Sequence, residues 1–187
     1  KLDISSDIVG AMRMAVEPQM DCYMVYYTGA GGNLDPYSSI TQENITDDYI
    51  EQGNLMAQAA IWACDNMTKR DTGKVQSLRR DQLKGGDNAN GFLSYAFSIG
   101  DVAFITAAYE MFDTNGVFIK ENSPYDMTFV VTMANGVAGY VPAEWAYEYG
   151  ENVVAYEVAT GGHAKGTAES LANGYVEMLN ELYPTRK

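Results

Sequence analysis

The stretch that decides the fold runs from Met127 to Pro142 and reads Met-Thr-Phe-Val-Val-Thr-Met-Ala-Asn-Gly-Val-Ala-Gly-Tyr-Val-Pro. Its first half is rich in β-branched and aromatic residues, and it is bounded by Pro124 on one side and Asn135-Gly136 on the other. This pattern predicts a buried strand, Met127–Met133, followed by a tight turn. Glu110 precedes Tyr140 by 30 residues. Two oxygen ligands carried on such a scaffold can share one metal ion.

Two further apolar stretches, Cys22–Thr28 and Asp101–Thr106, lack polar alternation and are also predicted to be central strands. Helices are predicted over Asp47–Met67 and Thr167–Leu182, and a strand or extended segment over Val153–Ala159. The predicted buried face of the first helix is Ile50, Leu55, Ala59 and Trp62 or Ala63, and that of the second is Leu171, Tyr175, Met178, Leu179 and Leu182. Helices and strands alternate, which predicts an α/β fold with a layered mixed sheet and flanking helices.

Composition narrows the classes of partner. The chain has 187 residues, enough for one domain with a core, and a formal net charge of −13. That charge argues against nucleic acid and anionic membranes and is compatible with a cation site or a neutral substrate. No run of 18 apolar residues is present, so no transmembrane segment is predicted. Because the sequence begins at Lys1 without a methionine, we expect a processed form or a fragment.

The loop Gly31-Gly32-Asn33-Leu34-Asp35-Pro36 follows the first apolar stretch. Its glycines permit positive φ, and its amides are candidates for an oxyanion hole. Asp35 is either a turn former or a carboxylate that acts as a general base. Asn33, and Asn135 in the later turn, either orient a substrate or close turns. No Lys-Ser/Thr follows the loop, which argues against phosphate binding.

Four local sequences together resemble the catalytic domain of the neutral/alkaline non-lysosomal ceramidases, a family with bacterial members. The loop 31–36 is similar to that family's Gly-Asp/Asn-Val/Leu-Ser-Pro loop, and the segment ending in Glu110 is similar to one that ends in Pro-Gly-Glu. The closest match is 129–142. The fourth is Tyr156-Glu157-Val158 followed by Gly166-Thr167-Ala168-Glu169 and a final helix. The resemblance implies that residues 1–187 are the C-terminal half of a single ceramidase-like α/β catalytic domain.

The resemblance also implies a site. The family binds one zinc ion through two histidines, a glutamate and a tyrosine, and a loop serine attacks the amide. By position, Glu110 and Tyr140 resemble the glutamate and tyrosine ligands, and Asp35 stands where the serine would be. Gly32, Asn33 and Asn135 are then candidates for substrate binding. Both histidines would come from an N-terminal half of the same protein, upstream of Lys1, because His163 matches neither of them.

Two functions remain open at this point. The first is a metal-dependent hydrolase that cleaves an amide-type (N-acyl) bond of a small-molecule or lipid substrate by a zinc-activated water, with Asp35 as general base. The second is a non-catalytic relative that binds a lipid, a glycan or a protein. Glu110 is alternatively a solvated residue at a helix start, and Tyr140 an ordinary half-buried strand tyrosine. The family resemblance also implies an extracellular or periplasmic location.

Overall fold

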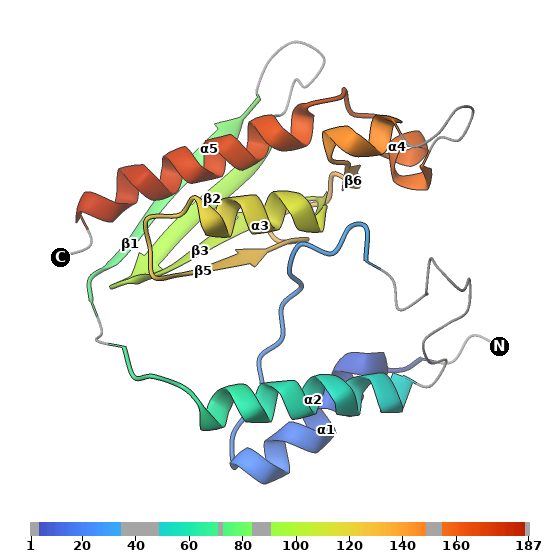
Figure 1. Ribbon diagram of the computed structural model, residues 1–187, viewed down its shortest axis with the longest axis vertical. Coiled ribbons are helices and arrows are strands. Elements are labelled where there is room, and N and C mark those ends of the chain that lie inside the picture. Colours follow the sequence, from blue (N-terminus) through green and yellow to red (C-terminus); the bar gives the residue numbers. More distant parts are fainter. Residues whose placement is uncertain (1–3, 35–48, 71–72, 84–90, 149–154, 186–187) are drawn as a thin grey trace. The chain divides into compact units, whose positions relative to one another are not determined.

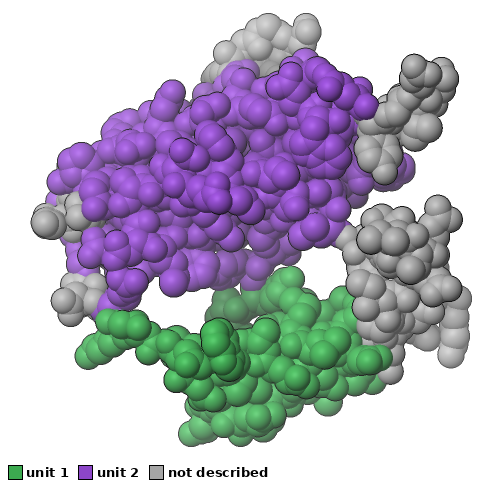
Figure 2. Space-filling model, in the orientation of Figure 1, with its two compact units in different colours: residues 1–26, 35–69 green, residues 27–34, 70–187 purple. Residues whose placement is uncertain are grey.

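The computed structural model describes residues 4–34, 49–70, 73–83, 91–148 and 155–185 (Figure 1). The chain divides into two compact units, shown in different colours in Figure 2. Unit 1 comprises residues 1–26 and 35–69, and unit 2 comprises residues 27–34 and 70–187. Asp35 and Pro36 of the predicted catalytic loop lie outside the described residues. No described helix is both long and apolar enough to cross a membrane.

Unit 1 is a pair of helices, α1 (Asp7–Met20) and α2 (Tyr49–Asp65), that meet through small residues. The buried positions of α2 are Gly53 and Ala57. A Cβ atom on Gly53 would lie 2.5 Å from the Cβ of Ala11 and 2.7 Å from a backbone oxygen of α1. The prediction that the large apolar residues of α2 face the interior is wrong, since Leu55 is 55% and Trp62 68% exposed. Such close backbones leave room only for small side chains between the helices.

Unit 2 is built on a mixed four-stranded sheet in the order β1-β2-β3-β5. The strands are β1 (Val75–Gln82), β2 (Phe92–Ile99), β3 (Val102–Ala107) and β5 (Met127–Val131). The first three pair antiparallel, and β5 pairs parallel to β3 after a crossover through α3 (Asp113–Glu121). The predicted α/β fold with a mixed sheet and flanking helices is confirmed.

One face of the sheet is covered by α3 and by α5 (Thr167–Leu182), as Figure 1 shows. The predicted apolar face of α5 is confirmed, because all five residues are buried in the core: Leu171, Tyr175, Met178, Leu179 and Leu182. The other face carries Phe97, Phe104 and Phe129, whose stacked ring centroids are 4.6 and 4.9 Å apart along the row. Alternation along each strand therefore separates a helix-covered face from an aromatic one.

Three predicted strands need correction. Cys22–Thr28 forms no strand, and Tyr23 is 91% and Val25 82% exposed. The backbone hydrogen bonds of this segment include Cys22 N to Glu17 O, Met24 N to Glu17 Oε1 at 3.0 Å and Thr132 N to Thr28 O, and the structure assigns no strand to it. Apolar composition predicted burial there, but a strand also needs a backbone partner along its length.

The strand predicted over 127–133 lies at the edge of the sheet. The stretch 153–159 was predicted as a strand or extended segment, but its residues 156–159 belong to a helix, α4 (Tyr156–Gly161).

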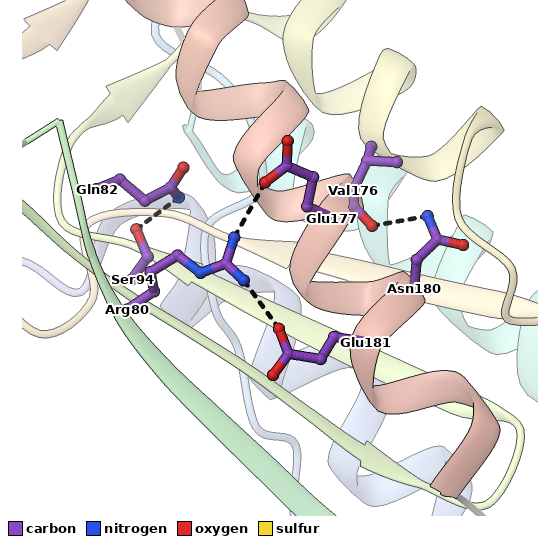
Figure 3. A network of polar contacts seen from close by, with 7 residues as sticks. All are labelled: Arg80, Gln82, Ser94, Val176, Glu177, Asn180 and Glu181. Atoms are coloured by element: carbon purple, nitrogen blue, oxygen red, sulfur yellow. Dashed lines mark hydrogen bonds and ion pairs between the residues drawn. The ribbon is translucent and has the colours of Figure 1, made fainter.

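Strand β2 was not predicted, because Ser94 and Ser98 interrupt its apolar pattern. Both serines are fully buried. Ser94 Oγ accepts a hydrogen bond from Gln82 Nε2 at 2.9 Å, which supplies the partner that a buried hydroxyl needs (Figure 3). Ser98 Oγ, by contrast, has no hydrogen-bond partner among the described residues.

Candidate functional site

Glu110 and Tyr140 lie opposite each other on a small parallel sheet. Strands β4 (Glu110–Met111) and β6 (Tyr140–Val141) pair with Glu110 in register with Tyr140. The neighbouring backbone fixes this register, since Glu110 N donates to Gly139 O at 2.9 Å and Ala138 N donates to Ala108 O at 2.7 Å. Met111 and Val141 are buried in the core. Because side chains alternate along a strand, Glu110 and Tyr140 share the opposite face.

The Glu110 carboxylate interacts electrostatically with the Tyr140 phenol. The pKa of Tyr140 is raised, first by partial burial and then by the charge of Glu110, whose carboxylate also accepts a hydrogen bond from the phenol. Tyr156 and Glu157 raise this pKa further. In the chain as described, Tyr140 is therefore neutral at physiological pH. Ligation by its phenolate would need a cation close enough to offset these carboxylates.

The glycine loop docks against the strand that carries Glu110. Gly32 N donates to Met111 O at 2.8 Å, and Leu34 N donates to Gly31 O at 3.0 Å, which closes a turn. A Cβ atom on Gly32 would lie 2.8 Å from Glu110 O, closer than real Cβ contacts come. Gly32 therefore allows an approach that any larger residue would block.

Asn33 connects this loop to the helix that follows Glu110. Its side chain donates from Nδ2 to Asp113 Oδ1 at 2.8 Å and accepts from Asp113 N at 2.8 Å through Oδ1. Asp113 begins α3, so the second bond also satisfies an amide at the start of that helix. Both ends of the Asn33 amide are engaged in this clamp. Asp113 was not predicted, and its only signal in the sequence is an acidic residue placed to start a helix.

Asn135 closes the turn after β5. It adopts a left-handed backbone, with φ of 67°, and its Nδ2 donates to Thr106 Oγ1 at 2.9 Å at the end of β3. Asn135 therefore closes a turn, and its predicted role in substrate binding stays a prediction. The role predicted for Asp35 remains a prediction, because that residue lies outside the described part of the chain.

Helix α4 packs directly against Tyr140. A Cβ atom on Gly161 would lie 2.5 Å from Tyr140 O, and the Tyr156 ring meets the Tyr140 ring edge-on with centroids 6.0 Å apart. His163 Nε2 lies 3.2 Å from Ala138 O, and its ring packs on Phe92, so the imidazole is held beside β6 by other contacts. Tyr156 and Glu157 were quoted above only as part of a resemblance, but they prove to be neighbours of Tyr140.

The described residues fit part of a metal site. Glu110 and Tyr140 offer two adjacent oxygen donors. A cation bound to both would offset the repulsion between the Glu110 carboxylate and a Tyr140 phenolate. Within the described residues, no group of three or more His, Cys, Asp or Glu side chains is placed to hold a metal ion. Zinc sites in proteins use three or four protein ligands. Glu110 and Tyr140 alone would therefore leave such a site one or two ligands short.

Comparison with known proteins adds a likeness of fold. No protein-family model matches the sequence, and no curated protein matches it significantly. Among solved structures, the chain is similar to the neutral ceramidase from Pseudomonas aeruginosa, with a TM-score of 0.70 and 17% identity over 97% of this chain and 41% of that chain. It is also similar to a ceramidase complexed with C2, with a TM-score of 0.73 and 15% identity over 97% of this chain and 43% of that chain.

At these identities the likeness is one of fold, and the fold resemblance predicted from the sequence is confirmed. The chain spans about two fifths of the length of either structure.

Proposed function

We propose that this chain is part of the catalytic domain of a metal-dependent, ceramidase-like hydrolase that cleaves an amide-type (N-acyl) bond. The observation that carries the proposal is the register of Glu110 with Tyr140 on adjacent parallel strands, with the turn 31–34 docked beside them. The fold similarity to two ceramidase structures supports the same reaction class.

In this proposal, Glu110 and Tyr140 hold one zinc ion together with two histidines from an N-terminal half of the same protein. The bound ion would supply Lewis acidity for the hydrolysis. Tyr140 must release the proton on its Oη before that oxygen can ligate, and Glu110 now favours the protonated form. Zinc binding should therefore release a proton from Tyr140 and become tighter as pH rises.

The loop residues have supporting roles in the proposed site. Asn33 and Gly32 fix the turn that leads to Asp35 against β4 and α3. We assign to Asp35 the role of general base, which takes a proton from the attacking water. The N-acyl substrate class in this proposal comes from the family resemblance and is supported by the fold similarity to the two ceramidase structures.

The experiment that tests the metal site measures zinc content and N-acyl hydrolysis on the same preparations of the full-length protein. We expect Glu110→Gln and Tyr140→Phe to lose both zinc and activity, because each removes an anionic oxygen ligand. The matched controls are Glu157→Gln and Tyr156→Phe, which change the same residue types next to Tyr140 and remove no proposed ligand. Zinc retained in all four variants would contradict the site.

Asp35 separates the enzyme from the alternative, a non-catalytic relative that binds a lipid, a glycan or a protein. If Asp35 is the general base, Asp35→Asn keeps the metal and lowers turnover by roughly 10²–10⁴. Asp35→Ser restores the serine of the resembling loop and should gain activity on N-acyl lipids if the loop still supports that chemistry. A full-length natural protein with neither zinc nor hydrolysis would favour the binding protein.

A further inference from the structure

The turn 31–34 is attached to one continuous segment, 110–116, whose first residue is the proposed glutamate ligand. Gly32 N donates to a backbone oxygen of this segment at 2.8 Å. Immediately before the turn, Ala30 packs so closely on α3 that a Cβ atom on Gly116 would lie 2.4 Å from the Ala30 Cβ. Both contacts tie the loop to the segment that carries the proposed ligand.

The third attachment is the clamp between Asn33 and Asp113. Asn33 Nδ2 donates to Asp113 Oδ1, and Asp113 N donates to Asn33 Oδ1, each at 2.8 Å. The carboxylate is held in turn by α3, because the same Oδ1 accepts from Thr114 N at 2.7 Å. A charged acceptor strengthens the bond from Asn33, and a carboxylate is stabilised in the first turn of a helix. The Asp113 side chain therefore fixes Asn33 relative to the start of α3.

The contacts of Asn33 favour a positioning role over substrate binding. Both polar atoms of its amide have protein partners, whereas an amide that orients a substrate presents at least one of them to the ligand. Asn33 and Asp113 are also only half-buried. A hydrogen bond that water can replace adds little to stability, but its directionality still fixes how the two groups are oriented. The clamp is therefore suited to hold the turn in place rather than to stabilise the fold.

We propose that Asp113 is a positioning residue of the proposed active site, whose carboxylate holds the turn through Asn33 in a fixed place beside Glu110. The inference rests on the proposed function, in which this loop takes part in the chemical step. Loss of the clamp should therefore slow that step and leave substrate binding unchanged, because a small misplacement of a reacting group lowers kcat without removing a contact to the bound substrate.

The test exchanges the two partners of the clamp in the full-length protein. Asn33→Asp places a carboxylate against that of Asp113 and should lower kcat about tenfold to a hundredfold, with KM and zinc content unchanged. Adding Asp113→Asn again pairs an amide with a carboxylate and leaves the amide oxygen available to Thr114 N. This double variant should return kcat to within about threefold of the natural protein. A raised KM with unchanged kcat in Asn33→Asp would assign Asn33 to substrate binding and overturn the proposal. A folded double variant that stays as slow as Asn33→Asp would overturn it as well.

A further variant keeps the test decisive if the double variant fails to fold, as circular dichroism would reveal. Asp113→Ala removes the acceptor without adding a charge, and should also lower kcat about tenfold. Asn122→Asp is the matched control and should leave kcat unchanged. It makes the same substitution as Asn33→Asp, but at an exposed residue just after α3 whose Nδ2 donates to Phe118 O. Unchanged kcat in Asp113→Ala would overturn the proposal.

Amide hydrogen exchange reports the position of the turn without any need for activity. The N–H of Gly32, which is bound to Met111 O, should exchange severalfold faster in Asn33→Asp and Asp113→Ala, and should regain its natural rate in the double variant. Unchanged exchange in both single variants would overturn the positioning role, whatever the activity. A natural protein that shows this exchange pattern but no hydrolysis would overturn the proposed function and still support the clamp.

Discussion

Helices α2 and α5 are of similar length and both carry a periodic apolar face, yet only one of these faces is buried. In α5, Leu171, Tyr175 and Leu179 are each 0% exposed. In α2, Leu55 is 55% and Trp62 68% exposed. The comparison teaches that periodicity identifies which residues form an apolar face, whereas the neighbouring element decides whether that face is covered.

The two helices differ in what they pack against. Helix α5 lies on β1 and β2, where a sheet surface accepts large side chains. Helix α2 meets α1 through Gly53 and Ala57, so its contact is made by backbone and small side chains. This chain spans about two fifths of the structures that it resembles. We predict that another segment of the full-length protein covers the apolar face that α2 leaves exposed.

The largest expected effect comes from removing a large side chain from each helix in turn. Leu179→Ala in α5 should lower the free energy of unfolding of unit 2 by about 2–5 kcal/mol, because it removes packed atoms and leaves a cavity. Leu55→Ala in α2 should change the free energy by less than about 0.5 kcal/mol. Urea denaturation gives both values, and hydrogen exchange assigns each change to its helix. Similar losses in the two variants would show that the face of α2 is covered in solution.

The contrast between α2 and α5 also shows which features of the structure the sequence could predict. The α/β class, the α5 face and the strand at 101–106 follow from local patterns, and the family resemblance selected Glu110 and Tyr140, which the structure places in register. Cys22–Thr28 was mispredicted because its apolar character says nothing about whether another strand is there to pair with it. The Asn33–Asp113 clamp joins residues 80 apart, a contact that neither residue signals locally.

The second prediction tests the small-residue contact of unit 1. Gly53→Ala should destabilise the α1–α2 pair by about 1–3 kcal/mol, since its new Cβ would lie 2.5 Å from Ala11 Cβ and 2.7 Å from Ile8 O. The matched control is Asn54→Ala at the adjacent, exposed position of α2, which removes atoms instead of adding a Cβ between the helices. That change should stabilise the helix by up to about 1 kcal/mol through helix propensity. Hydrogen exchange of the two helices measures both, and stabilisation by Gly53→Ala would refute the close packing.

The third prediction concerns alkaline pH and a tyrosine at the centre of the α5 face. Tyr175 Oη donates to Thr106 O at 2.8 Å, and burial raises the pKa of Tyr175 well above its usual value. A raised folded-state pKa gives stability that is complete below the unfolded pKa, about 10, and that is lost as pH rises above it.

Tyr175→Phe should therefore cost about 1 kcal/mol at pH 7, through the lost hydrogen bond, and should make the decline above about pH 10 shallower. The free energy of unfolding measured by urea from pH 7 to 11 gives both quantities. Tyr49→Phe, at the 43% exposed start of α2, is the control and should alter that decline less. An equal decline in wild type and Tyr175→Phe would show that the buried phenol does not govern alkaline unfolding.

The prediction with the smallest expected effect concerns the ion pairs between α5 and the sheet. It tests whether these charges, rather than the apolar face of the helix, hold α5 to the sheet. Arg80 on β1 reaches Glu177 at 3.1 Å and Glu181 at 2.9 Å (Figure 3). The two carboxylates are 72% and 58% exposed, so water and salt screen the attraction. They also repel each other one helical turn apart, which offsets part of the gain. A double-mutant cycle of Arg80→Met and Glu181→Gln should give a coupling below about 1 kcal/mol in low salt and less in 1 M NaCl. A coupling above about 2 kcal/mol that persists in high salt would mean that the ion pairs, and not the buried leucines, distinguish α5 from α2.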